Sequence, residues 1–288
     1  MIRSILVVAT GDPADAATFA AALAVARPFG AHFDVLHVRA DPISAGIAMA
    51  TGAGSGAMTG ELIDQLEADA AQREARAKQG FERFCAEAGL TVPGTPAGPT
   101  NALSAEWHVE TGREPDWVAV HGRSADLVVA SRSEDGALGR STLEAVLLET
   151  GRPLLVPGPG PAAMPEAIER IAIAWKPVPQ AARAVALAMP LLHRASEVVI
   201  AMVEERADER DEIDRLSRYL GWHGLAPKIA RMRPGPHGAA ETLLAGIAGH
   251  ADLLVMGGYG HSRVREWVFG GFTQHVLAGA PLPVLMAH

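Results

Sequence analysis

Glycines bracket a basic segment near the C-terminus, in "VMGGYGHSRVREWVFGGFTQHVL". Gly257 and Gly260 follow an apolar run, and Gly270 and Gly271 precede a second one. Glycine adopts positive φ and lets the backbone approach a ligand closely, because it has no Cβ. Two clusters of backbone N–H groups separated in this way can bind successive phosphates. The segment therefore indicates a phosphate-binding site, with Gly257 and Gly260 expected to turn the chain at positive φ.

Polar and basic side chains accompany these glycines. His261, Arg263 and Arg265 supply positive charge between the two glycine pairs, and Thr273 supplies a hydroxyl. The residues from Phe272 onward favour a helix, whose N-terminus would offer unpaired amides to an anion. Ligands of open parallel sheets lie at the carboxyl ends of the strands. On that basis Trp175 and Val203, which end two predicted strands, join the candidate contact residues, and Trp175 either stacks on a base or packs in the core.

Several common catalytic and phosphate motifs do not fit the sequence. The pattern GxxxxGK[ST] does not occur, and Gly258 and Gly260 are not followed by the third glycine of GxGxxG. No HExxH motif or cysteine pair accompanies the eleven histidines, so no metal site is predicted and ordinary core or surface roles are expected for them. "GAGSGAM" does not match the GxSxG turn of serine hydrolases.

The elements that must position the glycines are short apolar runs that alternate with Ala-rich, helix-favouring segments. This alternation is typical of βαβ units and of a parallel sheet. The predicted strands are 5–10, 33–38, 104–109, 126–130, 153–157, 171–175, 197–203, 228–232, 252–256 and 283–287.

The ten runs form two sets of five in the same order. "ADLVVA" at 125–130 matches "ADLLVM" at 251–256, and "PLL" at 153–155 matches "PVL" at 283–285. Such an internal repeat predicts two domains, 1–157 and 168–288, joined by a linker rich in Pro, Gly and Ala. At the place of the glycine segment the first copy reads "SRSEDGALGRST". Ser131 replaces the first glycine, and Glu134 and Asp135 would repel a phosphate, so the N-terminal site is expected to be degenerate.

Composition limits the remaining possibilities. The chain is 49% hydrophobic and 20% charged, which suits a protein with a substantial core. A net charge of −8 argues against non-specific nucleic-acid binding. The single cysteine, Cys85, excludes an internal disulfide and favours a reducing compartment. Together with the lack of long apolar stretches, this predicts a soluble, cytoplasmic protein without a membrane partner.

Three further segments have simple structural interpretations. Cys85 is expected to pack on the apolar face of a helix beside Phe81 and Phe84. The charged segment 204–224 predicts an amphipathic helix that turns Ile213, Leu216 and Leu220 inward. The Gly- and Ala-rich stretch 41–61 is expected to be a surface connection, with a lid or partner surface as the alternative.

The spacing G-x2-G-x9-G, formed by Gly257, Gly260 and Gly270, resembles the nucleotide-binding motif of universal stress proteins. The likeness extends over nearly the whole chain as two tandem copies. Position 271 is Gly where the family has Ser or Thr, and Thr273 falls where a second hydroxyl is common. The family's acid after the first strand is present in the first copy as Asp12, whereas Trp175 and Lys176 stand there in the second.

The resemblance implies two doubly wound, Rossmann-like domains of the adenine nucleotide alpha hydrolase type, each with strand order 3-2-1-4-5. It also implies that the last strands of the two domains pair, which would make the chain an intrachain pseudo-dimer, with a further homodimer left open. The implied ligand is an adenine nucleotide, ATP or AMP with or without Mg²⁺, in the C-terminal domain. A stress-response or regulatory binding protein is favoured. The alternatives are a slow ATPase or other nucleotide-dependent enzyme, which the lack of an obvious general base disfavours, and an interaction scaffold with a vestigial pocket.

Overall fold

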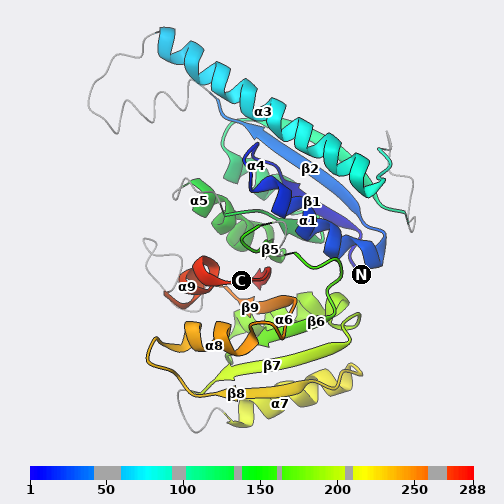
Figure 1. Cartoon of the computed structure of the whole chain (residues 1–288), viewed down its shortest axis with the longest axis vertical. Helices are drawn as coiled ribbons and strands as arrows, with labels where there is room; N and C mark the ends of the chain where they lie inside the picture. The colour runs from blue at the N-terminus through cyan, green and yellow to red at the C-terminus, as the bar shows by residue number, and fades with distance from the viewer. Residues whose placement is uncertain (42–59, 93–101, 133–137, 161–163, 205–209, 259–270) are drawn as a thin grey trace.

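A single ten-stranded sheet runs through the whole molecule (Figure 1). The computed structural model describes residues 1–41, 60–92, 102–132, 138–160, 164–204, 210–258 and 271–288. In the N-terminal half the strands are β1 (Ser4–Val8), β2 (His32–Arg39), β3 (Ser104–Thr111), β4 (Leu127–Val129) and β5 (Leu154–Val156). In the C-terminal half they are β6 (Arg170–Ala174), β7 (Glu197–Val203), β8 (Lys228–Met232), β9 (Leu253–Gly257) and β10 (Val284–Ala287).

Helices cover both faces of the sheet. In the N-terminal half they are α1 (Asp15–Ala26), α3 (Gly60–Ala88), α4 (Glu114–Gly122) and α5 (Leu138–Ala145), with the short turns η1 (Arg27–Phe29) and η2 (Val146–Thr150). In the C-terminal half they are α6 (Pro179–Leu192), α7 (Arg210–Trp222), α8 (Ala239–Ile247) and α9 (Gly271–Gly279). None of these helices is both long and apolar enough to cross a bilayer, within the part of the chain that the structure describes.

The strand order confirms the predicted fold class. It reads β3-β2-β1-β4-β5-β10-β9-β6-β7-β8, which is 3-2-1-4-5 in each half. All pairings within a half are parallel. The ten predicted strands are all present, with ends shifted by at most two residues.

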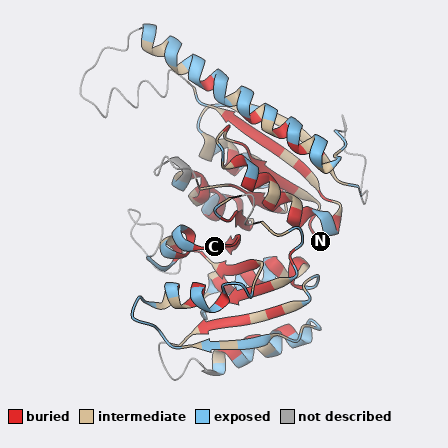
Figure 2. Cartoon of the chain, viewed as in Figure 1, coloured by how far each residue is buried: buried red, intermediate tan, exposed pale blue. Residues whose placement is uncertain are grey.

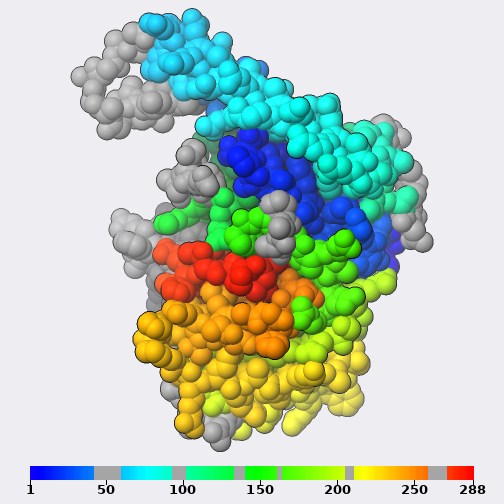
Figure 3. All heavy atoms as spheres, in the orientation of Figure 1, coloured from blue at the N-terminus to red at the C-terminus, as the bar shows by residue number. Residues whose placement is uncertain are grey.

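The two halves meet through their last strands. β5 and β10 pair antiparallel, with Leu155 opposite Leu285 at the centre of the seam. Both leucines are fully buried, since they expose 0% and 1% of their surface. The C-terminal residues therefore lie between the two halves, as the red segment in Figures 1 and 3 shows. This is the pairing of last strands that the resemblance implied, and it covers two edges that would otherwise be apolar and exposed.

Two hydrophobic cores, one on each face, run across both halves. Strand alternation sends Phe33 and Ile173 to the face covered by α1, α3, α6 and α7, and Leu36 and Met256 to the face covered by α4, α5, α8 and α9. Figure 2 shows the central strands as continuously buried. Because strands buried on both faces need apolar residues at every position, this explains why they read as unbroken apolar runs.

The two halves also share a hydrogen-bonded aspartate at the start of their first strands. Asp126 Oδ2 accepts hydrogen bonds from the amides of Arg3 and Ser4, at 2.7 and 3.2 Å. Asp252 Oδ2 does the same for the amides of Glu169 and Arg170, at 3.2 and 2.8 Å. Each aspartate precedes the fourth strand of its half and fixes the start of the first. The repeat is thus structural as well as a matter of sequence.

The other segments behave as expected where they are described. Ile213, Leu216 and Leu220 of α7 are buried. Cys85 lies half-buried on α3 and packs against the core next to the buried Phe81 and Phe84, and burial raises the pKa of its thiol. Residues 42–59 of the Gly- and Ala-rich stretch lie outside the described residues, and its last two residues begin α3.

Candidate functional site: a cavity at the strand ends of the C-terminal half

A cavity of about 430 Å³ lies at the carboxyl ends of β6, β7 and β9, where α6, α8 and α9 begin. Parallel strands that alternate with helices bring their carboxyl ends and the following helix N-termini to one edge of the sheet. The lining combines apolar residues from strand ends with residues from the first turns of the helices. It consists of Ala174, Trp175, Lys176, Val178, Gln180, Ala181, Ala201, Met202, Val203, Ala239, Leu243, Met256, Gly257, Gly271, Phe272 and Thr273.

Five of the nine predicted contact residues line this one cavity. They come from four separate places in the chain: Trp175, Val203, Gly257, Gly271 and Thr273. The other four fall in 259–270 and lie outside the described residues: Gly260, His261, Arg263 and Gly270. The two described ends of the glycine segment thus both line the cavity, since Gly257 is the last residue of β9 and Gly271 is the first residue of α9.

The expected role of Gly257 is wrong in one respect. Gly257 is the last residue of β9, and its φ is not positive. A Cβ at this position would lie 2.6 Å from the backbone N of Ala181 in the first turn of α6. The glycine is needed because strand and helix backbones approach each other here. Gly257 therefore lets α6 begin directly beside the strand end.

Gly271 has different surroundings. It is the first residue of α9, and a Cβ built there meets no described residue within 4 Å. Thr273, two residues later in the same turn, is 5% exposed and lines the cavity. The described surroundings of position 271 therefore leave room for a Ser or Thr side chain.

The electrostatic surroundings of the cavity favour an anion. α6 begins at Pro179 with no side-chain hydrogen-bonding cap and no acidic residue in its first turn. The amides of its first turn and the helix dipole therefore attract negative charge. Lys176, an exposed residue, is the one charged side chain among the described lining residues, and none of these is an acid.

Trp175 both packs against the core and lines the cavity. The residue follows β6, and its backbone N–H donates to the carbonyl of Ala201 at 2.9 Å. Its indole packs against the core on the α6 side of the sheet. The Nε1 atom is buried and has no hydrogen-bond partner among the described residues. The two interpretations of Trp175, core residue and ring facing a ligand, are thus compatible.

The matching place in the N-terminal half holds one buried and one half-buried carboxyl group instead. Ile5 pairs with Leu127 as Ile171 pairs with Leu253, so a shift of 166 (171 − 5) aligns the first strands. That shift places Asp15 where the C-terminal half has Ala181. Asp15 is 6% exposed and accepts hydrogen bonds from the amides of Thr10 and Gly11, at 3.0 and 2.8 Å. Burial nevertheless raises the pKa of Asp15.

A second carboxyl group lies at the start of α4. Burial raises the pKa of Glu114, although a hydrogen bond donated by Thr142 Oγ1 to its Oε1 at 2.6 Å acts in the opposite direction. Carboxylates here would repel a phosphate. The sequence interpretation invoked Glu134 and Asp135, which lie outside the described residues, and missed Asp15 and Glu114. Asp12, the acid expected near a nucleotide, lines a different cavity with Asp15, between α1 and α3.

Comparisons with known proteins agree with this architecture. The model of the Universal stress protein family matches residues 167–288. No curated protein matches the sequence. A universal stress protein from Archaeoglobus fulgidus DSM 4304 superposes with a TM-score of 0.68 at 16% identity, covering 99% of this chain and 95% of that one.

Two other solved structures share the fold at low identity. A functionally unknown protein from Pseudomonas aeruginosa PAO1 gives a TM-score of 0.55 at 15% identity, covering 99% of this chain and 92% of that one. The cytoplasmic domain of a prokaryotic cation chloride cotransporter gives 0.52 at 12% identity, covering 100% of this chain and 96% of that one. Likeness at such identity describes the fold alone, and function has to be argued from the site. Residues 167–288 therefore match the universal stress protein family, and residues 1–157 repeat the strand order of that half in the same sheet.

Proposed function

We propose that the protein binds one adenine nucleotide, ATP or AMP, in the C-terminal cavity and acts as a nucleotide-dependent regulatory protein in a stress response. The observation that carries the proposal is the convergence of Trp175, Val203, Gly257, Gly271 and Thr273 on one cavity. Its volume of about 430 Å³ falls in the range of small-molecule sites, roughly 300–1,000 Å³.

The cavity has two chemically different parts that suit the two ends of a nucleotide. Strand ends contribute apolar side chains such as Ala201, Met202 and Met256, which suit a planar base. The uncapped start of α6, the ammonium group of Lys176 and the hydroxyl of Thr273 suit phosphates. The basic residues His261 and Arg263 belong to the same proposed phosphate site on the strength of the sequence motif alone.

Binding without rapid turnover is the favoured mode. No carboxylate or imidazole is among the described lining residues, so that set offers no general base to activate water. The regulatory output would then follow from nucleotide occupancy. A slow ATPase remains the second candidate, since His261 belongs to the proposed site by its sequence position.

Mass spectrometry of small molecules released from the freshly purified chain tests binding, and phosphate release from added ATP over hours tests turnover. The proposal expects a co-purified adenine nucleotide and no phosphate release above a protein-free control. Release that Thr273→Val abolishes would favour the ATPase instead. The absence of any nucleotide, together with no heat on titration of ATP, would leave only the scaffold function.

A further inference from the structure

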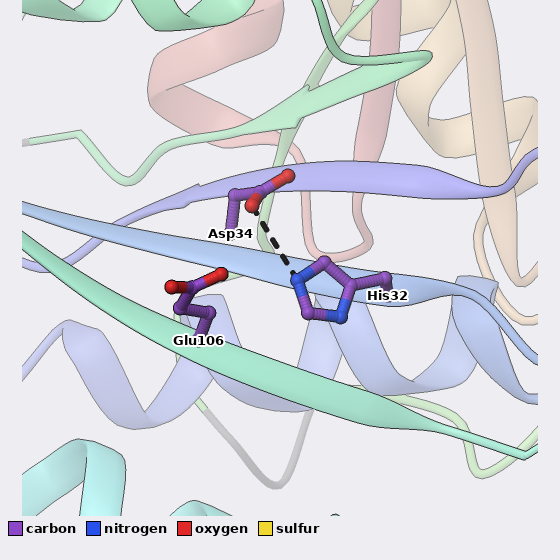
Figure 4. Close-up of side chains that lie close together, drawn as sticks. All are labelled: His32, Asp34 and Glu106. Atoms are coloured by element: carbon purple, nitrogen blue, oxygen red, sulfur yellow. Dashed lines mark ion pairs between the residues drawn. The ribbon is translucent and has the colours of Figure 1, made fainter. Parts of the chain in front are cut away.

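A cluster of imidazole and carboxylate side chains lies on the N-terminal half, away from the cavity. Its members are His32 and Asp34 on β2 and Glu106 and His108 on β3. They alternate along the strands with Phe33 and Val35, which belong to the core under α3, so they project from the opposite face. Figure 4 shows His32, Asp34 and Glu106 on the same side of two neighbouring strands.

The spacing of the donor atoms matches that of metal ligands. His32 Nε2 lies 3.5 Å from Asp34 Oδ1, and His108 Nε2 lies 3.6 Å from the same oxygen. His108 Nε2 is also 3.9 Å from Glu106 Oε2. Ligands of a tetrahedral zinc ion at bond lengths of about 2.0–2.1 Å stand about 3.3 Å apart. The donor atoms of His32, Asp34 and Glu106 all lie within 4.8 Å of one another, so small side-chain movements would bring these three onto one ion. His108 lies near both carboxylates but outside that distance from at least one of the three donors, so it must move further to become the fourth ligand.

Two serines hold the donors in the orientation that ligation requires. His32 Nδ1 lies 2.8 Å from Ser104 Oγ, which leaves Nε2 directed at Asp34. Ser4 Oγ donates to Asp34 Oδ2 at 2.8 Å, which leaves Oδ1 for the two histidines. Such second hydrogen bonds to ligating histidines and carboxylates are typical of metal centres, because they fix the tautomer and the ring orientation.

The cluster places like charges opposite each other in the absence of a cation. Asp34 and Glu106 are direct cross-strand partners, an arrangement that destabilises a sheet when both are ionised. The side chains of His32 and Asp34 are 28% and 32% exposed, which gives an ion access from solvent.

We propose that His32, Asp34, Glu106 and His108 bind one divalent transition-metal ion, with zinc the best match, and that the ion ties β2 to β3. Imidazole and carboxylate together are the ligand set of many zinc sites. The site is independent of the proposed nucleotide cavity. No sequence motif predicts the site. Its ligands form two pairs, each with one residue between its members, and the two pairs lie on strands that are distant in the chain.

Calorimetric titration of zinc chloride into the untagged, chelator-treated full chain tests the proposal. The wild-type chain is expected to bind at least one zinc ion, and the double variant His32→Ala/His108→Ala is expected to bind one zinc ion fewer per chain. Asp34→Asn should weaken that equivalent by at least about 100-fold, more than the roughly 10–100-fold typical of a second-shell change. Ser104→Ala should weaken it by about 10–100-fold through loss of orientation alone.

His193→Ala, at an exposed histidine after α6, is the matched control and should bind like wild type. Cobalt chloride gives a second readout, since a tetrahedral site produces visible absorption that the double variant should lack. Thermal melts by circular dichroism establish that each variant is folded. A zinc isotherm of the double variant that equals the wild-type one, or no zinc binding by wild type, would overturn the proposal.

Discussion

Replacing Gly271 by serine should strengthen nucleotide binding. The position begins α9 and lines the cavity, and none of the described residues occupies the space where a Cβ would stand. A serine hydroxyl there could donate one charge-assisted hydrogen bond to a phosphate oxygen, which is worth about 1.5–3 kcal/mol. The dissociation constant for ATP should therefore fall by roughly 10- to 150-fold.

Gly271→Ala is the matched control, because it adds the same Cβ without the hydroxyl. It should leave the affinity within about twofold of wild type, since the added methyl group contacts none of the described residues. Calorimetric titrations of ATP and of AMP into all three proteins measure the effect, and the gain should be larger for ATP if the hydroxyl contacts the outer phosphates. If Gly271→Ser binds ATP no more tightly than Gly271→Ala, the placement of the phosphates beside α9 is wrong.

Three further predictions concern stability. Gly257→Val should destabilise the C-terminal half by about 1–3 kcal/mol in chemical denaturation, because its Cβ would overlap the backbone of α6 2.6 Å away; an unchanged midpoint would mean that α6 moves freely. Asp126→Ala should lower the free energy of unfolding by about 1.5–3 kcal/mol, since two amides lose a carboxylate acceptor, and a loss below about 0.5 kcal/mol would show that water replaces it. Because the pKa of Glu114 is raised in the folded protein, folding favours the protonated carboxyl group. The resulting stabilisation is complete below pH 4.5, the ordinary pKa of a glutamate, and is lost as the pH rises through the pKa of the folded state. Glu114→Gln should therefore flatten the fall in stability above pH 4.5 relative to wild type and to the exposed-site control Glu67→Gln, and a parallel pH profile would contradict the assignment.

The strands could be predicted from sequence because they depend on a local signal that is repeated, whereas the pairing of the last strands was expected from the family resemblance. Apolar runs that are buried on both faces stand out from Ala-rich helices, and the two copies confirm each other's order. Gly271 and Thr273 were predicted from their position at the start of the helix that follows the glycine segment, and both line the cavity.

Features that depend on contacts between distant segments could not be predicted in the same way. The requirement for glycine at 257 comes from the backbone of α6, about eighty residues earlier, and not from its own φ. Asp15 and Glu114 look like ordinary helix-start acids until the fold buries Asp15 and half-buries Glu114 at the end of the N-terminal sheet. The apolar lining residues of the cavity, such as Met202 and Met256, cannot be told apart from core residues by pattern alone.

The stoichiometry and location of ATP binding test the central claim most directly. Calorimetric titration of ATP into the wild-type chain, Gly270→Val, Thr273→Val and Ser131→Val should show one site per chain. That site should be weakened by roughly tenfold or more in the first two variants and unchanged in the third. Two sites per chain, no site in wild type, or a site that only Ser131→Val weakens would contradict nucleotide binding in the C-terminal half.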